Sequence, residues 1–323
     1  MNEEAGNAER AKGREGRGSW SAGAAAAFFA IAVAIGSLAY LPIILHSYGL
    51  IAVDLGLLAY LYGLSPFIAA MLAARKVKGK VGPDLLFSQL SVKRAGSLAW
   101  NLLVPVGIAA ALITTAAAAT VASGGPFEAE KLVLYELVPL FLVNYLYNVW
   151  EEIAWRGFAQ PYLQERLSPV ASALVVSVGW AAWHWPLYAV KDSEMLANVP
   201  HFSLVFVGFA LESLVYASLY NSTRGSVFAC TSLHAATNAF GMALLSNTGA
   251  SRAAFWWYLA ARAALAGALL AARQRTNLSR SKAVTLADVE RFYSESERLK
   301  QERKDKMRID GTRGKNARAP SDE

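Results

Sequence analysis

The apolar run LVLYELVPLFLVNYLYNVW, residues 132–150, leads directly into EEIAWR, residues 151–156. A helix needs roughly 20 such residues to cross a bilayer. Two adjacent carboxylates at its end are costly near hydrocarbon, so they indicate a paired group or a functional site. On a helix, Glu152 and Arg156 lie on one face with the acid first, the favourable order for an ion pair. Glu151 points roughly 100° away, so the stretch predicts one braced carboxylate and one free carboxylate.

The whole chain shares this apolar character. Of its 323 residues, 55% are hydrophobic and 17% are charged, whereas soluble domains are about one quarter charged. The apolar residues form runs of about twenty, and the alternating strands of roughly ten residues that a transmembrane β-barrel needs are not seen. We therefore predict an all-α, polytopic transmembrane helical bundle of about eight spans. The expected spans are about 20–45, 50–74, 97–122, 131–150, 168–190, 202–220, 226–245 and 253–272.

The polar segments flank this domain. Residues 1–19 form an expected disordered tail, residues 20–273 the transmembrane domain, and residues 274–323 a charged C-terminal tail. Within the second tail, Thr285 and Asp288 form a capping pair that opens an expected soluble helix ending near Arg308.

The charge distribution predicts orientation. Of the Lys and Arg residues, 27 lie in the tails and in the loops on one side of the predicted spans, and only Lys131, Lys191 and Arg252 lie in the opposite loops. Cytoplasmic loops carry such an excess, so we expect an integral membrane protein with both termini in the cytoplasm, in the cell membrane if the source is prokaryotic. The net charge of +7 thus reflects topology, and we expect no nucleic-acid partner. The single cysteine, Cys230, excludes an intramolecular disulfide.

Two of the four histidines, His184 and His234, lie inside apolar spans. A lone histidine there is at least as often a helix-to-helix hydrogen-bonding residue as a ligand. Two histidines and the unpaired Glu151 can, however, bind zinc and leave one position open for water. Asn238 lies four residues after His234 and would share its helix face, where its amide would either stabilise an oxyanion or bond a neighbouring helix.

Three motifs follow in order on separate predicted spans. They are EExxxR at 151–156, an aromatic residue four before histidine at Trp180 and His184, and HxxxN at His234 and Asn238. In this order they resemble the CAAX-protease and bacteriocin-processing (Abi) family of intramembrane peptidases. The resemblance covers roughly a third of the chain, with an expected peptidase core at about 131–247, and departs from the family in having Trp180 where phenylalanine is frequent.

The resemblance implies a glutamate-dependent intramembrane endopeptidase. By carry-over, Glu151 activates a water, and His184 and His234 hold that water directly or through a metal. Asn238 stabilises the oxyanion, while Glu152 and Arg156 brace the site. A divalent metal, zinc first, bound by Glu151, His184 and His234 is one form of the site, and a metal-free site is the other. The implied partner, besides the bilayer, is a peptide or membrane-protein substrate, with or without a lipid.

Two other classes of function stay open at this point. A non-enzymatic membrane scaffold or immunity protein would keep the motif residues for packing. A transporter would use the buried carboxylates for solute or ion binding, but the chain lacks the internal repeat that many transporters show.

The candidate site residues lie at different distances from the starts of their predicted spans. At about 1.5 Å per residue, His184 lies some 24 Å into a helix that starts at Ser168, whereas His234 lies only about 12 Å into its own helix. Either the fifth span begins in the interface and enters the bilayer later, or the fourth span begins lower. The semi-polar residues 157–167 favour the first explanation, with this piece along the cytoplasmic interface. We expect the site to open to the cytoplasmic side.

Overall fold

A computed structural model describes residues 21–125, 134–193, 199, 201–245, 252–272, 278 and 282–316. Within these ranges the regular elements are all helical and no strand occurs, which confirms the all-α prediction. The predicted tail at 1–19 lies outside the described residues. The α-helices are α2 (Ala22–Ser47), α3 (Leu58–Lys78), α4 (Gly82–Ser88), α5 (Val104–Ala122), α6 (Leu137–Ala154), α7 (Gln160–Leu163), α8 (Pro169–Trp183), α9 (Trp185–Ala189), α11 (Phe202–Ser222), α12 (Val227–Phe240), α13 (Arg252–Ala272) and α14 (Leu286–Asn316).

Helices occupy all eight predicted spans. Among the described residues, six helical segments are long and apolar enough to cross a membrane: 22–47, 58–88, 99–122, 169–189, 202–222 and 253–272. Helices α6 and α12 fill the other two places but differ from these six. The first carries two carboxylates and two asparagines, and the second has only 14 residues. The protein is therefore an integral membrane protein whose two least membrane-like helices carry Glu151 and His234.

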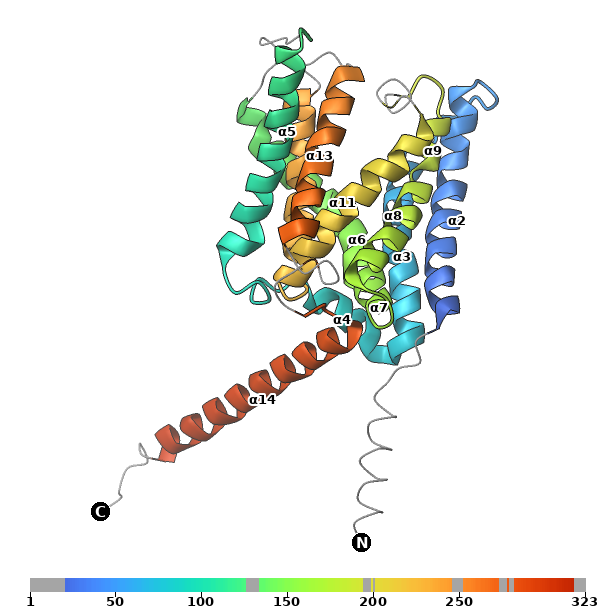
Figure 1. Ribbon diagram of the computed structural model, residues 1–323. Coiled ribbons are helices and arrows are strands. Elements are labelled where there is room, and N and C mark those ends of the chain that lie inside the picture. The colour runs from blue at the N-terminus through green and yellow to red at the C-terminus, as the bar shows by residue number, and fades with distance from the viewer. Residues whose placement is uncertain are drawn as a thin grey trace, which may run out of the picture.

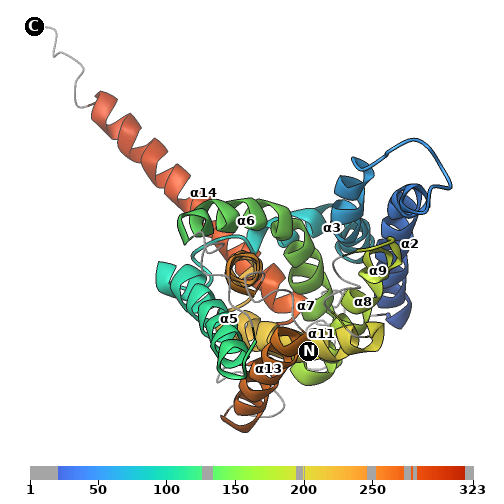
Figure 2. The ribbon, with the colours of Figure 1, turned by 90° about the horizontal axis from the view of Figure 1, so that it is seen from above.

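The helices form one bundle in which α12 packs against α6 and α5. Figure 1 shows α5 and α13 on one side, α2 and α3 on the other, and α6, α8 and α11 between them. Seen from above in Figure 2, α12 is enclosed by the other helices. Large apolar side chains on the outside, such as Leu38 and Leu146 at 70% exposure each, suit contact with lipid.

An aromatic cluster joins α2 to the end of α6 and to α8. The Phe28 ring lies 5.5 Å from that of Trp155, and the Trp183 ring stacks on Tyr62 at 4.2 Å. Such pairs add to the apolar burial that holds helices together. Gly36 permits the close approach, because a methyl group there would lie 2.8 Å from the Trp183 Nε1 atom.

Helix α6 does not end at the carboxylates. The chain continues as a π-helical turn, Trp155–Ala159, and then as α7, and residues 151–164 are all buried. Residues 157–164 are thus enclosed by the protein, and their depth at the cytoplasmic interface stays a prediction. The polar groups of this piece are satisfied inside the protein: Gln89 Nε2 donates to the Gly157 carbonyl at 2.8 Å, and Gln160 Nε2 donates to Gln164 Oε1 at 2.9 Å.

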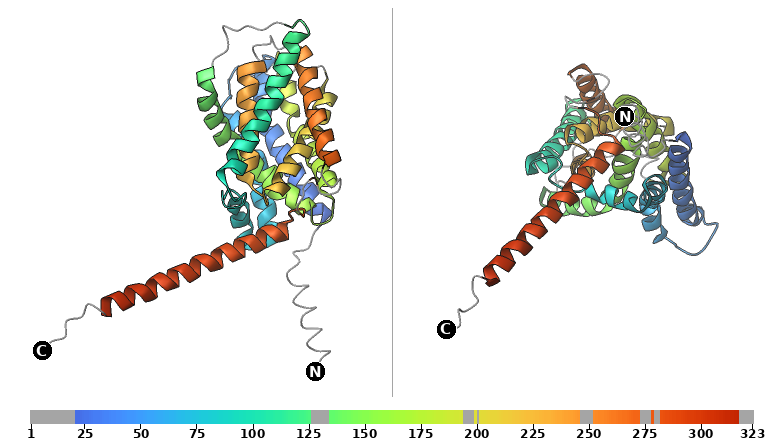
Figure 3. Two further views of the ribbon diagram at one scale, coloured as in Figure 1. Left: turned by 60° about the vertical axis from the view of Figure 1, so that its left-hand side comes forward. Right: turned by 90° about the horizontal axis from the view of Figure 1, so that it is seen from below.

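Helix α14 begins at the capping pair predicted from the sequence. The Thr285 amide donates to Asp288 Oδ2 at 3.0 Å, and the Asp288 amide donates to Thr285 Oγ1 at 3.2 Å. Its first turn also docks on α7, since the Ala287 amide donates to Glu165 Oε1 at 2.8 Å. Figure 3 shows the helix leaving the bundle at the end where α2 begins.

Candidate active site

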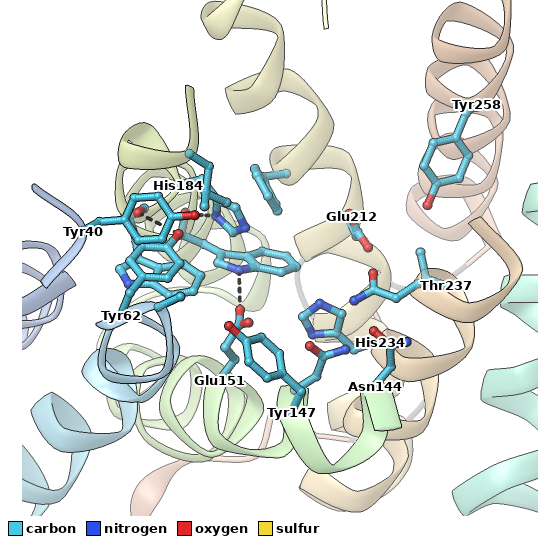
Figure 4. A pocket seen from close by; sticks show the side chains of 17 residues that line it. Tyr40, Tyr62, Asn144, Tyr147, Glu151, His184, Glu212, His234, Thr237 and Tyr258 are labelled. Atoms are coloured by element: carbon cyan, nitrogen blue, oxygen red, sulfur yellow. Dashed lines mark hydrogen bonds between the residues drawn. The ribbon is translucent and has the colours of Figure 1, made fainter. Parts of the chain in front are cut away.

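The candidate residues surround a cavity of about 470 Å³ between the helices. Figure 4 shows Glu151 on one side of it, His184 and His234 across from it, and Tyr258 farther away on α13. The lining residues are Tyr40, Ala59, Tyr62, Asn144, Tyr147, Asn148, Glu151, Trp180, Trp183, His184, Leu187, Phe209, Glu212, His234, Thr237, Asn238 and Tyr258. Four of the six predicted site residues line this cavity, and the other two, Glu152 and Arg156, lie behind it.

Glu152 forms the ion pair that its spacing predicts. Arg156 Nη1 donates to Glu152 Oε1 at 2.8 Å, and both side chains are at most 1% exposed. The Arg156 guanidinium also lies 4.2 Å from the Trp180 ring centre and 3.8 Å from that of Tyr216. Cation–π contacts of this kind are strongest when desolvated, so Arg156 is fixed between two aromatic rings and one carboxylate.

His234 is oriented by the same carboxylate. Its Nδ1 lies 2.9 Å from Glu152 Oε1. Because an ionised carboxylate only accepts hydrogen bonds, Nδ1 must carry the proton. In the neutral imidazole the Nε2 atom of His234 then keeps its lone pair, and this residue contributes to the cavity lining. Glu152 therefore sets both the ring orientation and the tautomer of His234.

His184 lies where α8 ends and α9 begins. The predicted span at 168–190 is thus two helices, with Pro186 just after the break. His184 Nδ1 lies 2.8 Å from the carbonyl oxygen of Trp180, which can only accept, so Nδ1 again carries the proton and Nε2 keeps its lone pair. The imidazole packs 4.6 Å from the Phe209 ring.

Glu151 is the carboxylate that faces the cavity. Trp180 Nε1 donates to its Oε2 at 3.2 Å, and no other hydrogen bond to its side chain occurs within the described residues. Only 5% of the residue is exposed. One indole N–H thus holds one carboxylate oxygen, and the other oxygen is free to accept a proton from a bound water.

Two asparagines bring amide groups to the cavity. The side chain of Asn238, predicted from the HxxxN motif, makes no hydrogen bond within the described residues. The second, Asn148, was not predicted. It is 1% exposed, and its Nδ2 has no hydrogen-bond partner among the described residues. A buried unpaired donor beside a cavity is a place for a substrate oxygen.

The sequence held a signal for Asn148. Asn144, Asn148 and Glu151 recur at spacings of four and three, so they share one face of α6 within an otherwise apolar run. That polar face marks the cavity wall. Glu212 also lines the cavity, and Arg262 Nη1 pairs with its Oε2 at 3.2 Å.

The predicted metal ligands have suitable donor chemistry, because two imidazole Nε2 atoms and a carboxylate oxygen are typical zinc ligands. Their spacing does not fit a metal site. Among the residues that the structure describes, no three His, Cys, Asp or Glu side chains gather closely enough to hold an ion. Zinc bound by Glu151, His184 and His234 stays a prediction.

Glu151, His184 and His234 reach the same cavity because of where their helices begin and end. Helix α6 starts at Leu137 instead of Lys131, and the chain stays helical to Leu163, so Glu151 lies within a continuous helical segment and not at its end. The lining residues Tyr40, Ala59 and Leu187 show that the cavity also reaches α2, α3 and α9. An opening to the cytoplasmic side stays a prediction.

Comparison with known proteins identifies the region around the cavity. Residues 133–240 match the family described as Type II CAAX prenyl endopeptidase Rce1-like. A 58-residue stretch is 34% identical to "CAAX prenyl protease 2" of Methanococcus maripaludis, which is 18% of this chain and 21% of that protein. The chain thus spans about a fifth of the length of the curated relative it matches. The resemblance predicted from the three motifs is confirmed for this region.

Proposed function

We propose that this protein, whose residues 133–240 match the Rce1-like endopeptidases, is an intramembrane endopeptidase that uses a water activated by Glu151. One observation carries the proposal. Glu151 with a hydrogen bond on one of its two carboxylate oxygens, two histidines whose Nδ1 atoms face hydrogen-bond acceptors, and Asn238 line a single cavity of about 470 Å³. These groups together can bind, deprotonate and direct a water toward a carbonyl.

The proposed reaction proceeds in two steps. Glu151 takes a proton from the water, whose oxygen attacks the carbonyl carbon of the scissile peptide bond. The resulting tetrahedral intermediate carries its charge on the former carbonyl oxygen. Glu151 then gives the proton to the peptide nitrogen, and the carbon–nitrogen bond breaks to leave a new carboxyl end and a new amine.

The surrounding residues position this chemistry. Trp180 Nε1 holds one oxygen of Glu151 and directs the other toward the water. The Nε2 atom of His184 or of His234 accepts the second water hydrogen, while the Nδ1 protons of the two rings are held by the Trp180 carbonyl and by Glu152. Arg156 holds Glu152 in place through their ion pair.

Asn238 and Asn148 are the proposed oxyanion donors. Amide groups aimed at the developing charge in a water-poor site are worth more than in water. Asn148 supports this role independently, since its buried Nδ2 has no partner in the described part of the chain. A divalent metal on Glu151, His184 and His234 is the alternative means of holding the water, and no step of the mechanism depends on it.

The experiment that tests this function compares peptide ends in membranes. Cells that produce the wild-type protein, Glu151→Gln and the control Glu136→Gln are compared by mass spectrometry of new peptide termini in their membranes. Glu136 lies in the exposed turn before α6. We expect wild type and the control to share termini that Glu151→Gln lacks at equal protein levels. Identical termini in all three would instead favour the scaffold or immunity function.

A further inference from the structure

A second ion pair lies at the cavity wall, apart from the two carboxylates of α6. Arg262 Nη1 of α13 donates to Glu212 Oε2 of α11 at 3.2 Å, and the two side chains are 11% and 14% exposed. Both residues lie in helices that are long and apolar enough to cross a membrane. Ionisable groups there are costly and mark functional sites by default, yet the mechanism above gives this pair no role.

Arg262 is fixed in its place behind Glu212. Its guanidinium lies 4.1 Å from the ring centre of Tyr258, one turn earlier in α13. It also packs against the bare backbone of α11 at Gly208, where a methyl group would lie 3.2 Å from Arg262 Nη2. Gly208 and Glu212 are four residues apart and share a helix face. The glycine therefore makes room for the cation beside the carboxylate that it pairs with.

Glu212 is the member of the pair that lines the main cavity, whereas Arg262 borders only a separate void of about 10 Å³. Glu212 Oε1 makes no hydrogen bond within the described residues and is not fully enclosed. Figure 4 shows Tyr40 and Tyr62 to one side of Glu151 and Glu212 to the other. The cavity thus has a free hydrogen-bond acceptor on the side away from its tyrosine-rich wall.

The charge of the pair determines which group this acceptor suits. Arg262 compensates the charge of Glu212 at close range, so a cationic group would lose its hydration and gain little attraction in return. A neutral N–H group still gains a hydrogen bond to an ionised oxygen, which is stronger than one between neutral groups. A peptide that leaves water brings one such donor with each residue other than proline, and each donor needs an acceptor.

We infer that Glu212 binds the substrate by accepting a hydrogen bond from one of its backbone N–H groups. Arg262 is the positioning residue that holds the Glu212 carboxylate for this contact. The inference rests on the proposed function for the peptide nature of the substrate. Since α13 lies outside the matched region 133–240, a helix beyond that region contributes to substrate binding.

A purely structural pair would only join α11 to α13, and a double variant distinguishes the two roles. Glu212→Leu with Arg262→Met removes both charges at similar volume, a change that often leaves stability the same or higher. The matched control is Lys78→Met with Glu290→Leu, which removes an ion pair of 2.8 Å between α3 and α14, apart from the cavity lining. All proteins also carry Glu151→Gln, so that the peptide is bound and not cut.

The measurement is the Kd of a fluorescent peptide that spans one of the cleavage sites found in membranes, with thermal unfolding alongside. For the Glu212 and Arg262 double variant we expect an unchanged melting temperature and a Kd higher by about tenfold or more, the effect of losing a hydrogen bond to a charged group. The control should keep its Kd. Glu212→Gln, which keeps the shape of the side chain, should also weaken binding, and it serves as the test if the double variant does not fold.

Peptides methylated at single backbone nitrogens identify the donor. Methylation at one position should weaken binding to protein that contains Glu212 by about tenfold and should have no further effect on the double variant, because the two changes remove the same contact. Unchanged affinity in a folded Glu212 variant, or equal losses on methylation in both proteins, would overturn the inference. These Kd values do not depend on cleavage, so a wild-type protein that binds the peptide without cutting it would contradict the proposed function alone.

Discussion

At the scale of single residues, the site depends on two adjacent carboxylates that have different surroundings. Glu152 is enclosed, with Arg156 and His234 both on its Oε1 atom. Glu151 points into the cavity with one tryptophan N–H on it. The 100° between neighbouring residues on a helix produces this difference. A single helical turn thus supplies both a buried ion pair and the carboxylate that we propose as the base.

The first prediction concerns Asn148. In Asn148→Leu a side chain of similar volume replaces a buried amide with an unpaired donor. We expect the melting temperature to stay the same or rise, because an unsatisfied polar group is removed. We expect kcat to fall by about 10²-fold or more, the usual cost of losing one oxyanion donor. The assay is cleavage of a membrane peptide, with thermal unfolding in detergent alongside.

Asn144→Leu is the matched control for this variant. Asn144 lies one turn earlier on the same helix face, and its Nδ2 already donates to the Leu140 carbonyl at 2.8 Å. It should keep most of its activity. Equal losses in Asn144→Leu and Asn148→Leu would argue against a specific role for Asn148.

The second prediction concerns the buried ion pair. Arg156→Met leaves the Glu152 carboxylate without its cation in a site where both side chains are almost fully buried. Breaking such a pair costs about 3–5 kcal/mol, so we expect a large drop in the melting temperature. The double variant Glu152→Gln with Arg156→Met should recover part of this loss. A melting temperature unchanged in Arg156→Met would mean that the pair contributes nothing to stability.

At the scale of elements, close packing of α2 against α8 positions Trp180. Gly179 faces the Phe29 ring so closely that a methyl group there would overlap it. The neighbouring Trp180 holds Glu151 through Nε1 and His184 through its carbonyl oxygen. The separation between α2 and α8 therefore determines the positions of the Glu151 and His184 side chains.

The third prediction follows from this contact. Gly179→Ala should lower the melting temperature and reduce activity together, because α8 must shift away from α2. Gly107→Ala in α5 is the control, since a methyl group there meets nothing within 4 Å. Its helix should gain up to about 1 kcal/mol from the better propensity of alanine. Activity retained at the wild-type level in Gly179→Ala would contradict the proposed coupling of helix spacing to the site.

The features that could be predicted from the sequence are those that depend on residue spacing within one helix. The ion pair at 152 and 156 and the capping pair at 285 and 288 depend only on spacing along one helix, so both were predicted correctly. The burial of residues 157–164 could not be predicted in this way. Their polar groups are satisfied by Gln89 and Asn221, which are more than 50 residues away in the sequence, and composition alone made the segment resemble an interfacial one.

At the scale of the whole molecule, one end of the helical bundle is filled by packed residues, and a cavity lies within the bundle. Helices α4, α7 and the start of α14 lie at the end that holds the basic loops (Figure 1). The cavity extends from Glu151 along α6 to Asn144, toward the other end. The sequence showed the charge asymmetry and the positions of the apolar helices. It did not show which end was filled, because this depends on how helices distant in the sequence pack together.

The fourth prediction concerns the metal. The mechanism uses no metal, so purified protein should retain its cleavage rate after dialysis against a chelator and should contain well under one zinc per chain. Zinc at one per chain, lost in His184→Gln together with activity, would establish the alternative site of Glu151, His184 and His234. Elemental analysis of wild type and His184→Gln side by side distinguishes the two.

The most direct measurement of the central claim is the cleavage rate of purified protein in liposomes with a membrane peptide taken from the termini found in cells. Wild type and Glu151→Gln are compared at equal melting temperature, with the newly formed carboxyl group followed in ¹⁸O-labelled water. We predict that wild type places ¹⁸O in the new carboxyl group and that Glu151→Gln is slower by about 10³-fold or more, in line with the loss of an essential base. A folded Glu151→Gln that cleaves at the wild-type rate would contradict the account.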